Sequence, residues 1–385
     1  MSPLTLHLPV DSSELWLYTV KERRHFQTVS RFTSRIAYAA AHVVASPLSE
    51  NESEDAIDWK ATLRFREYLW SLGFGVAEAM DTAQRGMGLD WKAARELIRR
   101  SATAAAAGSR PIVCGAGTDQ LAVGKTHSLA EIIAAYQEQC SWIEDCGGRV
   151  VVMASRALAA SARSLDDYQE VYSRVVRGCK GNVLLHWLGS MFDPVLGGYW
   201  GAPDLDVATE NFLALLADLG PKVAGVKVSL LDKDREILLR QRLPEDTKVF
   251  TGDDFSYPEL ILGDKQGFSH ALLGIFDGIA PTASAAFGAL DRGDSMEFLK
   301  ILEPTVPLSR HIFQIPTYYY KTGLVFLAYL NGLQTHFRLV GGLESARSVL
   351  HLSRLFVLAD EAGLLQQPEL AVERMRDFLK LAGID

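Results

Sequence analysis

Lys227 is the residue whose surroundings most directly indicate chemistry. It lies in the segment Val223–Ser229, where every other residue before the final serine is apolar or glycine. Burial among apolar neighbours lowers the pKa of a lysine, so that a free amine exists near neutral pH. Such an amine can attack a carbonyl carbon and form a Schiff base. The structural alternative is a lysine that extends from a strand end to solvent, or that pairs with Asp253 or Asp254.

Polar residues also stand at the ends of several other short apolar segments. In a barrel of parallel strands, catalytic groups come from the carboxyl ends of the strands and from the loops that follow them. By this criterion the candidate catalytic residues are Lys227, His186, Asp81 and Thr82. The candidate substrate-binding residues are His42, Glu78, Trp187, Asp193, Ser229, Asp253, Asp254 and His270.

A divalent metal is a competing use of the same positions. Imidazole and carboxylate ligands from several strand ends are how barrel enzymes hold zinc, manganese or magnesium. The possible ligands are His42, Glu78, Asp81 and His186, with Asp253 and His270 nearby in the predicted ring. Neither an HxH nor an HExxH spacing occurs, so we expect no cofactor and keep a metal-dependent lyase or isomerase as the alternative.

Eight short apolar segments must position these residues, and each is followed by a stretch that can form a helix. The segments are 36–45, 73–80, 111–115, 149–154, 182–187, 223–229, 247–251 and 266–271. Continuous apolar segments suit strands buried on both faces, as in a parallel sheet. Eightfold alternation predicts an α/β fold, the (β/α)8 TIM barrel. An open doubly wound sheet would have a glycine-rich turn after its first strand, where this chain has Ala45-Ser46-Pro47.

Helix-capping residues support this division of the chain. Asp58 and Asp90 each precede the similar sequences Trp-Lys-Ala, and each can cap the first turn of a helix. Ser128 and Glu131 have the spacing of a capping box. Asp204 begins a further helix that should end at Gly220.

Two regions exceed a minimal barrel. Residues 1–35 are predicted to form an N-terminal extension with a strand pair, from the segments LTLHLP and ELWLYTV. Residues 36–311 form the predicted barrel. Residues 312–385 form a predicted C-terminal helical region packed on it, with helices at 318–333, 343–362 and 368–381.

Composition narrows the class of protein. The chain has 385 residues, of which 48% are hydrophobic and 22% charged, with a net charge of −8. We therefore expect a soluble cytoplasmic protein that binds neither nucleic acid nor membrane. The longest apolar run, Gly323–Leu333, is too short to span a bilayer, and the first twenty residues lack the basic and apolar segments of a signal peptide. The four cysteines form no CxxC pair, which is typical of reduced, buried thiols.

Five motifs in the C-terminal half resemble those of a known family. They are Gly225-Val226-Lys227-Val228-Ser229, Phe250-Thr251-Gly252-Asp253-Asp254, Gly267-Phe268-Ser269, Ile279-Ala280-Pro281 and Asp291-Arg292-Gly293-Asp294. In order and spacing they resemble the dihydrodipicolinate synthase and N-acetylneuraminate lyase superfamily of class I aldolases. The segments Leu185–Gly189 and Met191–Pro194 resemble an uncharacterised branch of that superfamily, a domain of unknown function. The resemblance implies that Lys227 is the Schiff-base lysine.

Departures from the superfamily pattern change the expected site. A proton-relaying tyrosine ends the fifth strand of the superfamily, and His186 stands in that place. An imidazole has a pKa nearer neutral than a phenol, so we expect His186 to act as general acid and base. The superfamily's pair of threonines after the second strand is only half retained, as Asp81-Thr82.

The third departure concerns the substrate. The superfamily's arginine that holds the pyruvate carboxylate should fall just after the fifth strand, where this chain has Asp193 and no arginine. Unless Arg156 or another cation reaches this position, an anionic keto acid would be repelled. The resulting hypothesis is a Schiff-base aldolase or lyase for a neutral sugar or keto-sugar derivative, whose hydroxyls the carboxylates would bind. A non-catalytic ligand-binding barrel is a further alternative, and a homodimer or homotetramer is the expected assembly.

Overall fold

A computed structural model describes residues 3–11, 14–49, 56–244 and 246–384. Internal contacts group the chain into two compact units. The barrel unit comprises Arg35–Ala41 and Phe74–Gly274, and the helical unit comprises Met1–Ser34, His42–Gly73 and Ile275–Asp385. This grouping does not test where separately folding domains begin and end, so the predicted boundaries at residues 35 and 311 stay predictions.

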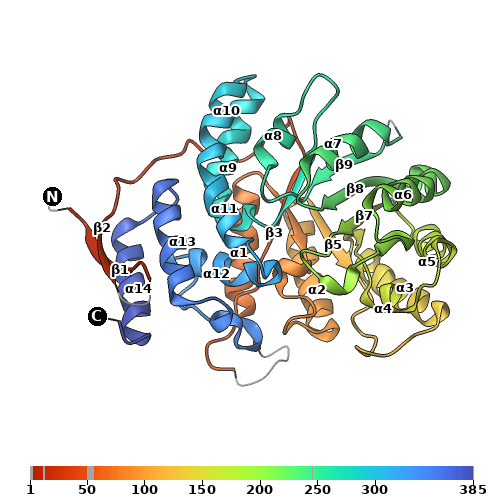
Figure 1. Ribbon diagram of the computed structural model, residues 1–385, viewed down its shortest axis with the longest axis horizontal. Helices are drawn as coiled ribbons and strands as arrows, with labels where there is room; N and C mark the ends of the chain where they lie inside the picture. Colours follow the sequence, from red (N-terminus) through yellow and green to blue (C-terminus); the bar gives the residue numbers. More distant parts are fainter. Residues whose placement is uncertain (1–2, 12–13, 50–55, 245, 385) are drawn as a thin grey trace. The chain divides into compact units, whose positions relative to one another are not determined.

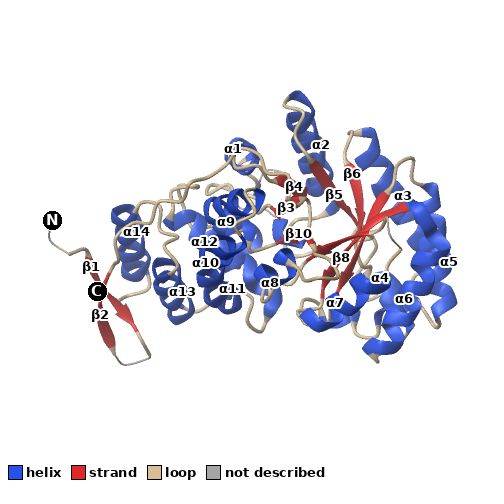
Figure 2. Cartoon of the chain, turned by 90° about the horizontal axis from the view of Figure 1, so that it is seen from above, coloured by secondary structure: helices blue, strands red, loops and turns tan. Residues whose placement is uncertain are grey.

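Eight parallel strands close into a barrel, which confirms the predicted fold class (Figures 1 and 2). The strands are β3 (Ala37–Ala40), β4 (Gly75–Glu78), β5 (Ile112–Ala116), β6 (Arg149–Val152), β7 (Val183–Leu188), β8 (Val223–Ser229), β9 (Lys248–Thr251) and β10 (His270–Leu273). They pair in chain order, and β10 closes the ring against β3. Because all eight run the same way, their carboxyl ends share one rim of the barrel.

Helices follow strands β4 to β9 and pack on the outside of the barrel (Figure 2). In the barrel unit they are α2 (Trp91–Ala107), α3 (Leu129–Asp145), α4 (Arg156–Ser161), α5 (Leu165–Gly178), α6 (Leu205–Leu219), α7 (Lys233–Arg242) and α8 (Tyr257–Leu262). The predicted caps form: Asp90 accepts a hydrogen bond from Ala93 N, and Ser128 and Glu131 make the capping box. Asp204 likewise caps α6, which ends at Gly220 as predicted.

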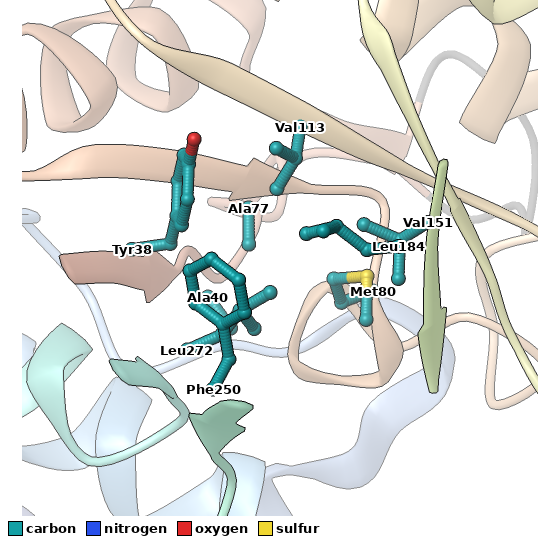
Figure 3. Packing of buried hydrophobic residues seen from close by; sticks show 9 residues of the cluster. All are labelled: Tyr38, Ala40, Ala77, Met80, Val113, Val151, Leu184, Phe250 and Leu272. Carbon is teal, nitrogen blue, oxygen red and sulfur yellow. The ribbon is translucent and has the colours of Figure 1, made fainter. Parts of the chain in front are cut away.

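The barrel interior is packed with side chains rather than open. Figure 3 shows the cluster, made of Tyr38, Ala40, Ala77, Met80, Val113, Val151, Leu184, Phe250 and Leu272. Side chains alternate between the two faces of a strand. His186, two positions beyond Leu184 on β7, therefore faces the interior as well. The cluster closes the barrel below His186 and excludes water from that side.

The predicted bounds of the first and eighth strands are wrong. The first strand was expected over 36–45, whereas β3 ends at Ala40. The eighth was expected over 266–271, whereas β10 begins at His270. Residues 263–267 form a turn instead, in which Gly263 has φ +83° and Asp264 N donates to Gly267 O at 2.9 Å. His270 therefore starts the last strand, and its predicted place at the carboxyl rim is wrong.

The helical unit contains the strand pair and the C-terminal helices, both as predicted. Strands β1 (Thr5–Pro9) and β2 (Leu15–Thr19) pair antiparallel, and β1 contacts α13 and α14 from the other end of the chain (Figure 1). The helices are α1 (Trp59–Ser71), α9 (Phe276–Asp291), α10 (Ser295–Leu302), α11 (Val306–Ile312), α12 (Tyr320–Leu330), α13 (Val349–Glu361) and α14 (Pro368–Leu381). Asp58 caps α1 as expected. No helix in the described residues is long and apolar enough to cross a membrane.

Candidate active site

Lys227 lies two residues before the carboxyl end of β8 and faces the barrel interior, paired in register with His186 of β7. Only 5% of Lys227 is exposed. Gly252, at the end of β9, makes room for it. A Cβ at position 252 would lie 2.9 Å from Lys227 Cε and 2.8 Å from Val228 O, and closer still to the Ser229 hydroxyl. The absence of a side chain at Gly252 therefore leaves room for the Lys227 side chain next to it.

Burial sets the charge state of this lysine. Desolvation lowers the pKa of Lys227, and the carboxylates of Asp81 and Asp254 oppose that effect. Asp81 belongs to the short 3-10 helix η2 (Asp81–Ala83) after β4, and Asp254 belongs to the loop after β9. Burial thus makes the neutral amine easier to form, while Asp81 and Asp254 keep negative charge near Lys227.

His186 is a neutral hydrogen-bonding partner at this site. Its Nε2 lies 3.1 Å from Ser229 Oγ, and burial together with the nearby Lys227 lowers its pKa well below the usual value. Asp81 opposes that shift. The buried Nδ1 of His186 has no hydrogen-bond partner among the described residues. The expected near-neutral pKa of His186 is therefore corrected: the imidazole is neutral at neutral pH and can accept a hydrogen bond, whereas its role as general acid and base stays a prediction.

Candidates from β7, β8 and the loop after β4 thus surround the lysine. Lys227, His186 and Ser229 are brought together on β7 and β8, and Asp81 influences both Lys227 and His186. Thr82 is buried beside Asp81 in η2. These residues form the candidate catalytic set, whose chemical roles stay predictions.

The two acidic residues after β9 differ in what they contact. Asp253 Oδ1 accepts hydrogen bonds from Phe255 N at 2.8 Å and Ser256 N at 2.9 Å, so this oxygen organises the turn. The negative charge of Asp254 instead raises the pKa of Lys227, against the effect of burial. Of the pair, Asp254 is the better candidate to face a ligand.

Asp193 is neutralised by an ion pair. Its Oδ2 lies 2.5 Å from Arg156 Nε, and its Oδ1 accepts a hydrogen bond from Val195 N at 3.3 Å. Arg156 is thus the cation that reaches this carboxylate. The expectation that Asp193 alone would repel an anionic substrate is weakened accordingly.

Trp187 and Glu78 point away from the barrel interior, and their assignment to substrate binding stays a prediction that these orientations do not support. Trp187 packs edge-on against Phe212 of α6, with ring centroids 5.1 Å apart. Glu78 follows the inward Ala77, so alternation directs its side chain toward the helices, where its Oε1 accepts a hydrogen bond from Ala79 N at 2.9 Å. Strand position alone could not settle which face each side chain would occupy.

The two remaining histidines also have structural partners. His270 Nδ1 accepts a hydrogen bond from Ile36 N at 3.1 Å, and burial lowers its pKa to about 4. His42 lies in the helical unit, where its Nδ1 is 2.8 Å from Asp277 Oδ2 and its Nε2 is 3.1 Å from Gln334 Oε1. Both ring nitrogens of His42 are engaged, which leaves neither for a substrate or metal.

Arg85 is a site-supporting residue that sequence analysis missed. It donates to Ala79 O at 3.1 Å and to Gly115 O at 2.7 Å, and pairs with Asp119 at 2.7 Å. It thereby joins the loop after β4, which contains Asp81, to the loop after β5. The sequence offered one indication of this role, because Arg85 stands four residues after the predicted catalytic acid Asp81.

Glu236 was missed as well, because it lies on a helix whose sequence is strongly polar. It is buried, and its Oε1 accepts a hydrogen bond from Ser269 Oγ at 2.7 Å. Burial raises its pKa to about 8. The same carboxyl bonds Thr251, whose Oγ1 in turn accepts from Asp253 N at 3.1 Å, so Glu236 supports the turn that carries Asp254.

Metal ligation finds no support in the geometry. Among the described residues, no group of three or more His, Cys, Asp or Glu side chains could hold a metal ion. The proposed ligand set of His42, Glu78, Asp81 and His186 is therefore not assembled as a site. The expectation of no cofactor stays a prediction.

Gly252→Ala should disable the lysine without removing it. The new methyl group must displace Lys227, Ser229 or the Val228 carbonyl, because the contacts at 2.8 and 2.9 Å leave no room for it. We expect the labelling of Lys227 by trace acetic anhydride, measured by peptide mass spectrometry, to fall about tenfold or more, since a free-energy change of ~1.4 kcal/mol is tenfold. Gly181→Ala is the control, because its added methyl would meet only Glu144 Oε1 at 3.7 Å. Unchanged labelling in folded Gly252→Ala protein would contradict the packing argument.

Comparisons with known proteins agree with this architecture. The model of a family described as a protein of unknown function (DUF993) matches residues 6–384. The chain belongs to the DUF993 family. A search of curated proteins finds no match for this DUF993 chain.

Solved structures similar to the DUF993 chain include dihydrodipicolinate synthases. The enzyme from Thermotoga maritima is 17% identical with a TM-score of 0.63, covering 86% of this chain and 99% of its own. The Aquifex aeolicus enzyme is 14% identical with a TM-score of 0.64, at 86% and 99% coverage. The Acinetobacter baumannii enzyme, solved in complex with pyruvate, is 16% identical with a TM-score of 0.62, at 86% and 100% coverage. The DUF993 chain thus has the fold of the predicted superfamily.

Proposed function

We propose that this protein is a Schiff-base lyase of the aldolase type, and that Lys227 is its nucleophile. The observation that carries the proposal is the buried Lys227 amine, which has a lowered pKa and lies beside a neutral imidazole. Burial of an amine in a closed interior is costly unless it is used or paired. The chain shares its fold with dihydrodipicolinate synthases, and the proposal rests on the Lys227 site rather than on that fold.

The proposed reaction begins when the neutral Lys227 amine attacks a substrate carbonyl, and loss of water gives a cationic iminium. The iminium accepts the electron pair of a bond at the α-carbon and becomes an enamine. That bond is either the C–C bond that breaks in a retro-aldol step, or the C–H bond whose electrons expel a leaving group from the β-carbon together with that group's own bonding pair. Neutral His186 accepts the proton released in that step, and Ser229 can pass it on because its hydroxyl lies 3.1 Å from Nε2. Asp81 and Asp254 stabilise the positive iminium. Protonation and hydrolysis by water then release the product and free Lys227.

A neutral, hydroxylated carbonyl compound is the proposed substrate class. Asp81 and Asp254 place negative charge near the lysine, which disfavours an anion and can accept hydrogen bonds from hydroxyls. The Asp193–Arg156 pair is neutral overall and contributes no net repulsion. The proposal therefore depends on Asp81 and Asp254 rather than on Asp193. Pyruvate is the competing substrate, because the Acinetobacter baumannii enzyme was solved in complex with it.

A trapping screen tests both parts of this proposal. The purified protein is incubated with pyruvate and with neutral aldoses and ketoses, reduced with borohydride, and analysed by intact and peptide mass. We expect a reduced adduct on the peptide that contains Lys227, formed faster with a neutral sugar than with pyruvate. A faster adduct with pyruvate would overturn the substrate class alone, whereas adducts absent from Lys227 with every compound would overturn the Schiff-base function.

The assembly and location of the protein stay predictions. A homodimer or homotetramer is expected, and light scattering of the purified chain measures it directly. The cytoplasmic location and the absence of nucleic-acid binding are likewise expectations from composition.

A further inference from the structure

The helical unit contains a cavity of about 220 Å³ that none of the proposed chemistry uses. Its walls come from the segment 23–28, from the end of α1, from the middle of α9 and from the residues after α13. The lining side chains include three basic residues, Arg23, Arg24 and His25. Sites for drug-sized ligands occupy ~300–1,000 Å³, so this cavity suits a smaller molecule.

The N-terminal segment that forms one wall is fastened at both ends. Before the cavity, Tyr18 Oη and Lys21 N donate to Asp360 Oδ2 of α13 at 2.6 and 3.0 Å. After it, Val29 N donates to Ser284 Oγ of α9 at 3.0 Å, and that hydroxyl donates to Val29 O at 2.9 Å. The basic residues between these anchors are therefore held over the cavity.

Arg24 is positioned by a glycine. Gly363, just after α13, has φ +73°, and a Cβ there would lie 2.8 Å from Arg24 Cγ and closer still to Cδ. The aliphatic part of Arg24 thus lies against the bare glycine backbone. A side chain at 363 would force the arginine out of this place.

The charge balance of the lining favours an anion. Among the described lining residues, three are basic and none is acidic. Two carboxylates of the helical unit have other partners: Asp360 accepts from Tyr18 Oη and Lys21 N, and Asp277 pairs with His42 at 2.8 Å. Arginine is the residue of choice for binding carboxylate or phosphate oxygens.

Neutral donors and apolar groups complete the lining. Thr282 is 1% exposed, and its buried hydroxyl has no hydrogen-bond partner among the described residues. Tyr68 keeps its proton, because burial raises its pKa to about 12, and its hydroxyl accepts from Gln366 Nε2 at 3.2 Å. Phe26, Leu72, Pro281 and Leu364 supply apolar surface. A buried hydroxyl without a partner is costly, and a bound oxygen would satisfy it.

We propose that this cavity is a second ligand site, which binds a small organic anion with an apolar body and one phosphate or carboxylate group. Arg23, Arg24 and His25 bind the anionic group, and Thr282 supplies a neutral hydrogen bond. The apolar part of the ligand packs on Phe26 and Pro281. The site lies wholly within the helical unit and does not depend on Lys227 chemistry.

Calorimetric titration of the full chain with phenyl phosphate, benzoate and inorganic phosphate tests the site. We expect phenyl phosphate or benzoate to bind with a sub-millimolar Kd, and the better of the two identifies the anionic group. Inorganic phosphate should bind at least tenfold more weakly, because it lacks the apolar body. Affinity should fall as salt is raised from low ionic strength, since the partly exposed arginines are screened.

Two variants and two controls separate this site from other binding. Arg24→Met should weaken binding about tenfold or more and Thr282→Val about threefold, because each loses one hydrogen bond to the anion. Arg64→Met, an exposed arginine of α1 outside the lining, and Lys227→Met should bind as the wild type does. Failure of both organic anions to bind, or equal affinity in Arg24→Met and Arg64→Met, would overturn the proposal.

Discussion

Lys227→Met should abolish the borohydride-trapped adduct completely. Methionine keeps a similar length and apolar stem, so it fills the space beside Gly252 while removing the only atom that can form the imine. The substitution also removes a buried ionisable group, so we expect the free energy of unfolding to be unchanged or increased. The adduct is quantified by intact mass with the best carbonyl compound from the screen.

Lys321→Met is the matched control for this substitution. Lys321 and Lys227 are the two buried lysines in the part of the chain that the structure describes. Lys321 lies in α12, where its Nζ is 3.3 Å from Tyr318 O, and it takes no part in the proposed chemistry. Lys321→Met protein should therefore form the wild-type amount of adduct. An adduct that persists in Lys227→Met would assign the chemistry to another amine.

Glu236→Gln should remove a large pH dependence of stability. Burial raises the pKa of Glu236 from 4.5 to about 8, so between those pH values the folded chain holds a proton that the unfolded chain releases. The stabilising contribution is therefore complete below about pH 4.5 and is lost as pH rises to about 8. At ~1.4 kcal/mol per pKa unit, the loss across this window is on the order of 3 to 5 kcal/mol.

Urea unfolding at several values between pH 5 and 8.5, followed by far-ultraviolet circular dichroism, measures this effect. The wild type should lose stability with rising pH more steeply than Glu236→Gln, whose neutral amide does not titrate. Glu259→Gln is the control, because Glu259 of α8 is exposed and pairs with Lys233 on the surface. Parallel pH profiles for the wild type and Glu236→Gln would show that Glu236 is charged in the folded protein at neutral pH.

Local sequence determined the barrel because its signals act over short distances. Eight apolar segments and their capping residues specify strands and helices without reference to distant contacts. Asp58, Asp90, Ser128 and Asp204 cap the helices that they were expected to cap. The errors occur where apolar character is a poor guide to length, as in 266–271, which a glycine turn interrupts.

The centre of the site could also be predicted from the sequence. Lys227 and His186 lie near strand ends with apolar neighbours on both sides, and parallel strands place such residues on one rim. Their predicted proximity is confirmed by their pairing in register across β7 and β8. The motif resemblance added the expected chemistry but no distances.

Only the tertiary structure decided what surrounds the lysine. Whether a strand-end side chain faces the interior depends on alternation and register. Trp187 and Glu78 each follow a residue whose side chain faces the interior, so their own side chains face the helices. The charge at Asp193 depended on Arg156, which lies 37 positions away. The space for the Lys227 side chain depended on Gly252 of the next strand. Sequence spacing therefore determined which residues reach the rim, whereas burial, charge pairing and free space depend on neighbours that only the folded chain brings together.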